Sequence, residues 1–488
     1  MSVLAFLGAG TVYLKHPTAS ALNPATFYLL FHGLVFVVRP VLSLFYEYRA
    51  IHDAMQFEPT EWDKTQVLIA TNLALFVFIS VSLAVAKPLV FKQEQQEIND
   101  RRRLLMIFTP FAIVLSAVAI YSLYWLWNQS ATGENLSQFD TRTGESRLIN
   151  ANGYFISLGT MLGPVTAIIA FLGRFKLKSM LPFVIFAILR FGTGTRNDVV
   201  SAAAAIGLLF LFDKRMKWPN IKVVLLVIAC IPVFNAIQLD RGAGIRQFFG
   251  FGTDRVYVAQ ERAPLDSIDF ANMEFFEYIV YVVPQRSGTY DYFLNNLQLF
   301  TEPIPRSLWP DKPVGPPIRR FDLYIWGQVI GATMSVPGAG WYSMGYAGVV
   351  IWTALFALAY GLVYRRFVMS MQGNIAAIAM TVFASISIVA FRDGSLVTIF
   401  RTGLFFYVPI VLLAIADRYA RKGEAVEAIQ SAWITSATAK NSPVFANPKD
   451  RREAIRDRIE PSRLAAELER SAKRMSPRER RLALKAKL

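Results

Sequence analysis

The chain has 488 residues, of which 54% are hydrophobic and only 18% charged, and its mean hydropathy is +0.37. Apolar runs too long for soluble helices recur along it, which excludes a soluble globular protein and indicates a polytopic membrane protein. The net charge is +16, and the lone cysteine, Cys230, lies in an apolar run, which excludes a disulfide scaffold and a cysteine-based metal site.

Because a helical span needs about 20 apolar residues, the sequence predicts an all-α protein with roughly eleven membrane segments. In chain order, the clear segments cover residues 24–46, 65–86, 104–127, 153–173, 221–238, 341–364, 375–391 and 396–416. Two shorter apolar runs, at residues 180–191 and 199–212, predict a hairpin. Residues 3–14 predict one further short segment.

Basic residues between the segments predict the orientation, because short cytoplasmic loops retain lysine and arginine. Their clusters, at residues 87–103, 174–178, 214–217 and 365–366, all fall on one side of the predicted membrane. The expected domains are a transmembrane bundle at 1–238 with a re-entrant-like hairpin at 180–212, a large outer loop at 239–340, transmembrane helices at 341–416 and a cytoplasmic tail at 417–488. The tail carries 18 basic and 10 acidic residues, a composition suited to an anionic lipid leaflet, and we expect no nucleic-acid partner.

The hairpin contains the stretch RFGTGTRND, residues 190–198, at its apex. Each predicted arm reaches only about 20 Å, so the apex ends within the outer leaflet, where an unpaired guanidinium costs a few kcal/mol. We therefore expect Arg190 and Arg196 to form a buried cationic site that opens outward. The alternative is that they pair with Asp198 or extend to lipid headgroups.

Other cations lie at the same predicted level of the membrane. They are Arg39 and Arg401 inside apolar segments, Arg392 in the last outward turn, and Arg241, Arg246, Arg306 and Lys312 in the large loop. Guanidinium groups match phosphate oxygens bidentately, so this set predicts a phosphate or pyrophosphate site. Taken singly, Arg39 is also consistent with a side chain that extends to headgroups, and Arg319 and Arg320 with solvated loop charges.

Four motifs between residues 194 and 395 suggest a family. The GTR of the hairpin, IPRSLWPDKP in the large loop, PGAGWYSMGYAG at the return to the membrane and FRDGS near the end resemble, in this order, the O-antigen and exopolysaccharide repeat-unit polymerases of the Wzy group. The resemblance covers about residues 153–416. It implies a glycosyltransferase of the bacterial inner membrane that polymerises undecaprenyl-pyrophosphate-linked oligosaccharides at the periplasmic face. It also implies a GT-C-like fold akin to that of the O-antigen ligases.

In that reaction the leaving group is a lipid pyrophosphate, so arginines near it act as electrostatic catalysts, and we expect no metal ion or cofactor. The expected pyrophosphate-binding residues are Arg190, Arg196, Arg241, Arg246, Arg306, Lys312, Arg392 and Arg401, with Arg196, Arg306 and Arg392 as the core. No histidine follows His52 in the sequence, so a carboxylate is expected as the base. Glu274, one helical turn from Glu277 in NMEFFEY, is favoured over Asp240, although both patterns also fit ordinary surface carboxylates.

The family often carries an acidic residue before the tyrosine of the re-entering motif, whereas this chain reads Gly340, Trp341 and Tyr342. Trp309, Trp341 and Tyr342 are therefore candidates for stacking on sugar rings, with a membrane-interface belt as the alternative.

Two other functions stay open at this stage. A ligase would transfer finished glycan to another acceptor with the same fold, but the outer-face histidine that would distinguish it is missing after His52. A transporter for anionic glycan would line a continuous path with charge and show inverted repeats. A chain-length regulator and a flippase are conceivable protein partners of the predicted polymerase.

Overall fold

The computed structural model describes residues 1–48, 50–91, 97–131, 137–139, 146–148, 153–193, 196–225, 243–250, 265, 270–304, 308–309, 312–313, 315–327, 333–370 and 373–440. The chain divides into two compact units, Met1–Leu413 and Ala414–Leu488. In the second unit, the described part is helical, and Asp417 pairs with Arg421 one turn later at 2.9 Å.

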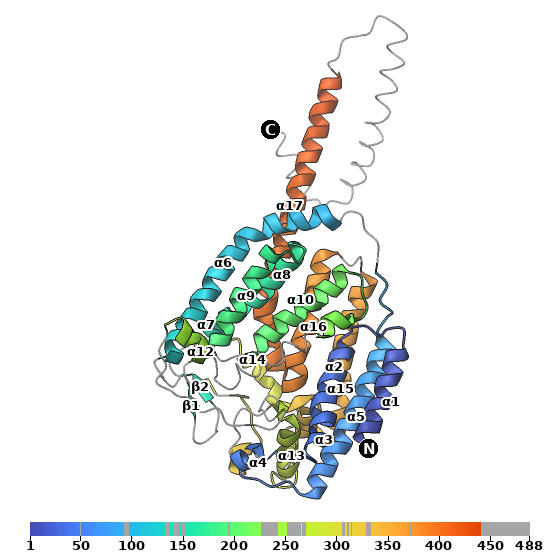
Figure 1. Ribbon diagram of the computed structural model, residues 1–488, viewed down its shortest axis with the longest axis vertical. Helices are drawn as coiled ribbons and strands as arrows, with labels where there is room; N and C mark the ends of the chain where they lie inside the picture. The colour runs from blue at the N-terminus through green and yellow to red at the C-terminus, as the bar shows by residue number, and fades with distance from the viewer. Residues whose placement is uncertain are drawn as a thin grey trace, which may run out of the picture. The chain divides into compact units, whose positions relative to one another are not determined.

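Helices dominate the first unit, as predicted (Figure 1). The first group is α1 (Ser2–Lys15), α2 (Pro24–Gly33), the π-helix η1 (Leu34–Val38), α3 (Arg39–Leu42), α4 (Ala50–Met55), α5 (Glu61–Val85), α6 (Glu97–Ala131), α7 (Gly153–Leu158), the 3-10 helix η2 (Gly159–Met161), α8 (Leu162–Leu172), α9 (Leu177–Gly192) and α10 (Asn197–Asp213). The second group is α12 (Ala243–Phe248), α13 (Asn272–Val282), η4 (Leu294–Leu297), α14 (Gln298–Thr301), η5 (Leu323–Ile325), α15 (Ser335–Met369), α16 (Asn374–Asp393) and α17 (Leu396–Lys440), which continues into the second unit. Within the described residues, the one departure from an all-α fold is an antiparallel pair of short strands, β1 (Ser137–Phe139) and β2 (Ser146–Leu148), with Ser137 opposite Leu148.

Six helical stretches of the described chain are long and apolar enough to cross a membrane. They are Pro24–Leu42, Glu61–Val85, Asp100–Asn128, Ser335–Met369, Asn374–Asp393 and Leu396–Gly423. Shorter apolar helices cover Ser2–Lys15 and Gly159–Leu172. The chain is therefore a multi-pass membrane protein, and ten of the predicted segments coincide with helices. The eleventh, at residues 221–238, is described only over 221–225, so the total of eleven stays a prediction.

The predicted hairpin is present as α9 and α10, which have 16 and 17 residues. Each arm is therefore about 25 Å long, more than the apolar runs alone indicated but still short of a 30 Å hydrocarbon core. Gly192 is the last residue of the first arm, and a side chain there would collide with Trp127, whose ring lies 2.1 Å from an ideal Cβ position. Trp127 also donates a hydrogen bond to the Leu189 carbonyl at 2.7 Å.

Three of the basic loops lie at one end of the first unit. Arg101, near the start of α6, is buried and donates to Asp213 at the end of α10 and to Asn374 at the start of α16, the latter at 3.1 Å. These contacts hold the beginning of α6, the end of α10 and the turn before α16 together (Figure 1). The sidedness predicted from the basic clusters agrees with this arrangement.

Breaking this network should destabilise the protein. Arg101→Ala removes the ion pair with Asp213 and the stacking of the guanidinium over Phe171, whose ring centroid is 4.2 Å away. We expect the free energy of unfolding to fall by about 3 kcal/mol, the cost of breaking a buried pair. Denaturant titration in detergent measures it, with Arg102→Ala, an exposed neighbour, as the matched control. Equal values for the two variants would show that the network contributes no stability.

The helix α13 lies against α4, α5 and α15 at the other end of the unit (Figure 1). Its two phenylalanines, Phe275 and Phe276, pack in one core cluster with Val67 of α5 and Trp341 of α15. Nine of its eleven residues are buried, so α13 is enclosed almost all round. Because its apolar residues fill the core on most sides, the polar residues that α13 carries are fixed in direction.

Candidate functional site

A cavity of about 310 Å³ opens where α3, the start of α5 and α13 meet. Arg39, Pro40, Ser43, Tyr46, Glu47, Tyr48, His52, Lys64, Met273, Glu274 and Glu277 line it. We call it the carboxylate cavity. Its volume fits a sugar residue better than a single water molecule, because a water occupies only about 30 Å³ in the liquid. Eight of its eleven lining residues have ionisable side chains, two of them tyrosines, which is unusual for an apolar bundle.

Arg39 and Glu274 form a buried ion pair at this cavity. The Nε and Nη2 atoms of Arg39 both lie 2.7 Å from Oε1 of Glu274. The guanidinium also donates to the Leu265 carbonyl and stacks over Tyr48, 4.2 Å from the ring centroid. Only 2% of Arg39 is exposed, so the interpretation that it extends to headgroups is wrong.

The π-helical turn before Arg39 has a local cause. Pro40 has no N–H and cannot bond the carbonyl four residues back, so the helix relaxes there. The Arg39 N–H instead reaches the Leu34 carbonyl, five residues back. Pi-helical turns often occur at functional sites, which is consistent with the role of Arg39 in the cavity.

Only one of the two carboxylate oxygens of Glu274 has a described hydrogen-bond partner. Its Oε2 atom is buried and has no hydrogen-bond partner among the described residues, although the side chain lines the cavity. Burial raises the pKa of Glu274, the charge and hydrogen bonds of Arg39 oppose that rise, and the nearby Glu277 adds to it. The interpretation of Glu274 as a surface carboxylate is therefore wrong. A buried carboxylate with a raised pKa and a free oxygen is suited to accept a proton.

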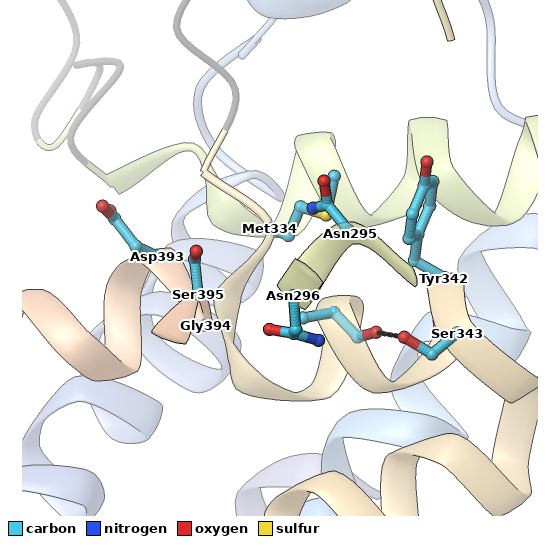
Figure 2. A pocket seen from close by; sticks show the side chains of 9 residues that line it. Asn295, Asn296, Met334, Tyr342, Ser343, Asp393, Gly394 and Ser395 are labelled. Atoms are coloured by element: carbon cyan, nitrogen blue, oxygen red, sulfur yellow. Dashed lines mark hydrogen bonds between the residues drawn. The ribbon is translucent and has the colours of Figure 1, made fainter. Parts of the chain in front are cut away.

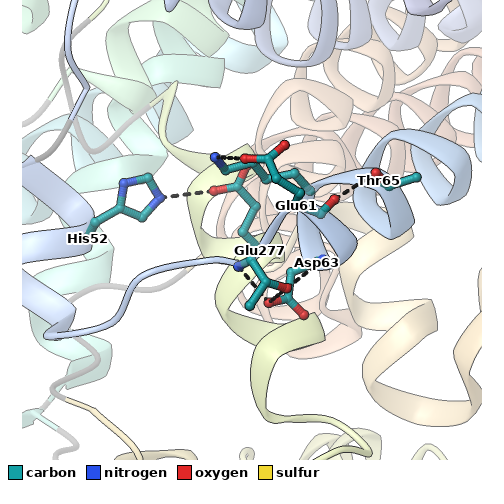
Figure 3. Close-up of polar contacts among 7 residues, drawn as sticks. His52, Glu61, Asp63, Thr65 and Glu277 are labelled. Carbon is teal, nitrogen blue, oxygen red and sulfur yellow. Dashed lines mark hydrogen bonds and ion pairs between the residues drawn. The ribbon is translucent and has the colours of Figure 1, made fainter.

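His52 lines the cavity and was not among the site residues predicted from the sequence. Its Nε2 atom lies 2.9 Å from Oε2 of Glu277, and the contact joins α4 to α13 (Figure 3). The edge of the imidazole faces the Phe57 ring, whose centroid is 5.1 Å away. His52 and Glu277 are 225 residues apart, so no local spacing could link them.

The start of α5 is fixed by a capping box, which places Lys64 at the cavity. The Thr60 N–H donates to Asp63 Oδ2 at 2.9 Å, and the Asp63 N–H donates to Thr60 Oγ1 at 3.2 Å (Figure 3). Asp63 also accepts from Gln285, just beyond α13, at 2.9 Å. The start of α5 is therefore linked to the chain just after α13 by a side-chain hydrogen bond.

Three predicted pyrophosphate-binding arginines gather at the apex of the α9–α10 hairpin. Arg190 is buried and pairs with Asp198, as the alternative interpretation proposed, but its Nε and Nη1 atoms have no hydrogen-bond partner in the part of the chain that is described. Arg246 of α12 is also buried and donates to the Gly192 carbonyl. Arg196 is the N-cap residue of α10. The buried Arg190 guanidinium, which keeps two donors without a described partner, is suited to an anion.

Two further predicted cations meet at Glu302. Arg401 of α17 pairs with the Glu302 carboxylate, and Lys312 Nζ lies 3.1 Å from the Glu302 carbonyl and 3.2 Å from the Ile304 carbonyl. Burial alone would raise the pKa of Glu302, but the hydrogen bond and charge of Arg401 outweigh burial and lower this pKa. These contacts indicate a structural role that the sequence did not predict for Arg401 and Lys312.

The lowered pKa predicts how stability depends on pH. A carboxyl whose pKa falls on folding adds stability above its unfolded pKa, about 4.3 for glutamate, and loses it as pH falls through the folded value. Arg401→Gln should therefore lower the unfolding midpoint at pH 7, and the difference from wild type should shrink as pH drops below about 4. Thermal unfolding across pH measures this, with the exposed Arg418→Gln as control. A difference that does not change with pH would exclude this ionic contribution.

The two C-terminal motifs, PGAGWYSMGYAG and FRDGS, come together. The first lies in α15, which kinks at Met344 and Gly345, and the second ends α16. Gly394 approaches Ser335 so closely that a Cβ would lie 2.1 Å from its carbonyl oxygen, and its φ is +67°. A pocket of about 20 Å³ between the motifs, lined by Tyr342 and Asp393, has room for about one water (Figure 2).

The remaining candidates have different surroundings. Arg392 lies 3.3 Å from Asp393 through its Nε atom, and its carbonyl accepts from Asn272 at 2.8 Å. Trp341 is buried, donates to the Val283 carbonyl at 2.9 Å and packs against Phe276, so it serves the core in this structure. Trp309 is half-buried. Asp240, Arg241 and Arg306 lie outside the described residues.

The comparisons with known proteins give one match. Residues 2–242 match the family model described as O-antigen polysaccharide polymerase Wzy. The matched region includes Arg39, His52, Lys64 and the hairpin, whereas the three motifs after residue 242 lie beyond it. Neither a curated protein nor a solved structure matches the chain. Over residues 2–242, just under half of its length, the chain is therefore similar to the O-antigen polysaccharide polymerase Wzy family.

Proposed function

We propose that the chain polymerises undecaprenyl-pyrophosphate-linked oligosaccharide repeat units into O-antigen or exopolysaccharide at the periplasmic face of the inner membrane. The family match supports polymerisation of lipid-linked repeat units. The observation that carries the proposal is the carboxylate cavity, which is lined by Glu274, a residue whose buried Oε2 atom has no described hydrogen-bond partner. A GT-C-like fold, and a flippase and a chain-length regulator as partners, belong to the same proposal.

The chemistry is a single displacement at the anomeric carbon of the donor sugar. The acceptor hydroxyl oxygen forms the new bond to that carbon, and the bond from the carbon to the pyrophosphate oxygen breaks. The electron pair leaves with the lipid pyrophosphate, and the hydroxyl proton passes to Glu274 Oε2. The configuration at the anomeric carbon is inverted.

Charge distinguishes the two sets of residues that would act at one anomeric carbon. Among the ionised side chains of the carboxylate cavity, Glu47, Glu274 and Glu277 outnumber Arg39 and Lys64, which suits sugar hydroxyls better than a pyrophosphate. At the hairpin apex, Arg190, Arg196 and Arg246 outnumber Asp198. We assign the leaving pyrophosphate to the apex arginines, together with Arg241, Arg306 and Arg392, because guanidinium groups stabilise the charge that develops there.

The position of the cavity supports a periplasmic site. Three basic loops lie at the opposite end of the helices from α3, α4 and α13 (Figure 1). Because basic loops stay in the cytoplasm, the cavity would face the periplasm and the basic tail the cytoplasm. A fusion reporter placed in the loop before α5 tests this orientation directly.

Deleting the gene in its native cell tests the polymerase proposal. Loss of a polymerase should leave glycan of a single repeat unit on the final acceptor, and the restored wild-type gene should bring back the ladder of longer chains. Loss of a ligase should instead leave full-length glycan on the lipid carrier and none on the acceptor. The two outcomes separate on a gel of the purified glycolipids.

The ligase is the second candidate because of one observation. An outer-face histidine distinguishes the ligases, and His52 provides one in the carboxylate cavity, beside Glu277. The family match is to polymerases, so polymerisation is the favoured function.

A further inference from the structure

The pair of His52 and Glu277 has no part in the displacement described above. The two side chains differ in exposure, with 21% of His52 exposed and 6% of Glu277. A neutral imidazole that donates Nε2–H to Glu277 keeps a lone pair on Nδ1, which can accept a further proton. Protonation would then create an imidazolium with the Glu277 carboxylate 2.9 Å away as its counter-ion.

Glu274 needs a group that accepts its proton if it acts as a base in repeated turnovers. Only 5% of Glu274 is exposed, and its free oxygen has no described partner through which a proton could leave. Burial raises the pKa of Glu274 despite the opposing charge of Arg39, and Glu277 adds to the rise, so burial favours the protonated form after the proton is taken from the acceptor. A polymerase must return this base to its ionised form before each new bond.

The geometry brings the two groups to one cavity. Glu274 and Glu277 are three residues apart on α13 and therefore share a face of the helix. His52 lines the same cavity and is the more exposed member of its pair. The charged and titratable groups that line this cavity around His52 are Glu274 and Glu277 of α13, Arg39 of α3, Lys64 of α5, and Tyr46, Glu47 and Tyr48 between α3 and α4. Arg39 pairs with Glu274 and not with Glu277. The Glu277 carboxylate can therefore act as the counter-ion of His52.

We propose that His52, with Glu277 as its counter-ion, carries the proton from Glu274 to solvent after each glycosyl transfer. This inference rests on the proposed function. The proton leaves Glu274 Oε2 through water in the cavity, binds His52 Nδ1 and is released to bulk water. Glu274 returns to its carboxylate form and His52 to its neutral form, so the step consumes no further reactant. His52 is thus a relay residue, and it touches neither the anomeric carbon nor the leaving group.

Rapid-quench kinetics on the reconstituted full chain tests the relay. With synthetic undecaprenyl-pyrophosphate oligosaccharide, His52→Ala should form the first bond in a burst close to wild type, and its later turnovers should be slower by about 100-fold. Added imidazole should restore the later turnovers of His52→Ala. His52→Gln, which can still bond Glu277 but cannot carry the proton, should show the same burst without rescue. His16→Ala, at the end of α1, is the matched control.

The outcomes separate the relay from the proposed function. A wild-type ladder with a His52→Ala variant that turns over normally would overturn the relay alone. Equal slowing of the first and later bonds, with no response to imidazole, would also overturn it and show that His52 only supports the fold. The absence of any product from the wild-type chain would overturn the proposed function and the relay together.

Discussion

Glu274→Gln is expected to abolish chain growth, with a fall in rate of about 10²–10⁴-fold, the usual contribution of a general base. The amide keeps the size of the side chain and accepts a bond from Arg39, but it cannot take a proton from the acceptor hydroxyl. The rate of repeat-unit addition by the reconstituted protein measures the effect. Because Arg39 loses its counter-ion, the folded fraction of each preparation must be measured alongside by size-exclusion chromatography.

Glu61→Gln is the matched control for this substitution. Glu61 is an exposed glutamate at the start of α5 that contacts Lys64 at 2.8 Å, so it lies near the cavity without lining it. The control should polymerise at the wild-type rate. A Glu274→Gln protein that is folded and makes a normal ladder would exclude Glu274 as the base and move the search to Asp240.

Arg39→Ala is expected to lower the free energy of unfolding by about 3–5 kcal/mol, because it leaves the buried Glu274 without its partner. The substitution also removes the bond to the Leu265 carbonyl and the stacking over Tyr48. Without the nearby cation, the pKa of Glu274 should rise further, so a smaller fraction of the residue would be ionised and able to act as a base. Both stability and chain growth should therefore fall.

A double variant separates the two effects. In Arg39→Met with Glu274→Leu, no charge is left unpaired, and replacing a buried ion pair by apolar residues is often neutral or stabilising. The double variant should recover most of the stability lost by Arg39→Ala and remain inactive. Recovery of chain growth together with stability would show that the pair serves the fold alone. Arg102→Ala again provides the control for a lost surface charge.

Helix positions could be predicted from the sequence because each span is a property of local composition. Long apolar runs predicted the membrane-spanning stretches of α5, α6, α15 and α16 to within a few residues of their ends. The short runs of the hairpin underestimated α9 and α10, since polar residues such as Lys178 and Asp213 extend a helix without being apolar. The strands β1 and β2 are three residues each and left no alternating pattern long enough to detect.

The site was only partly predictable, because its contacts are between distant parts of the chain. Glu274 could be chosen from the pattern NMEFFEY, but its partner Arg39 lies 235 residues earlier, and His52 lies 225 residues before Glu277. The predicted arginine site was expected to converge, whereas the described contacts place its members at the hairpin apex, at Glu302 and beside Asp393. The arginines could be predicted to bind an anion from their residue type alone. Which of their N–H groups stay available for an anion depends on tertiary packing, which the sequence does not show.

The most direct measurement uses purified protein in lipid nanodiscs with synthetic undecaprenyl-pyrophosphate oligosaccharide, in the presence of a metal chelator. We compare wild type, Glu274→Gln and Arg196→Ala and follow the products on a gel. We expect a ladder with regular repeat-unit increments from wild type, no ladder from Glu274→Gln, and a much fainter ladder from Arg196→Ala. A wild-type protein that transfers a single glycan and never extends it, or whose ladder requires the metal ion, would contradict a metal-independent repeat-unit polymerase.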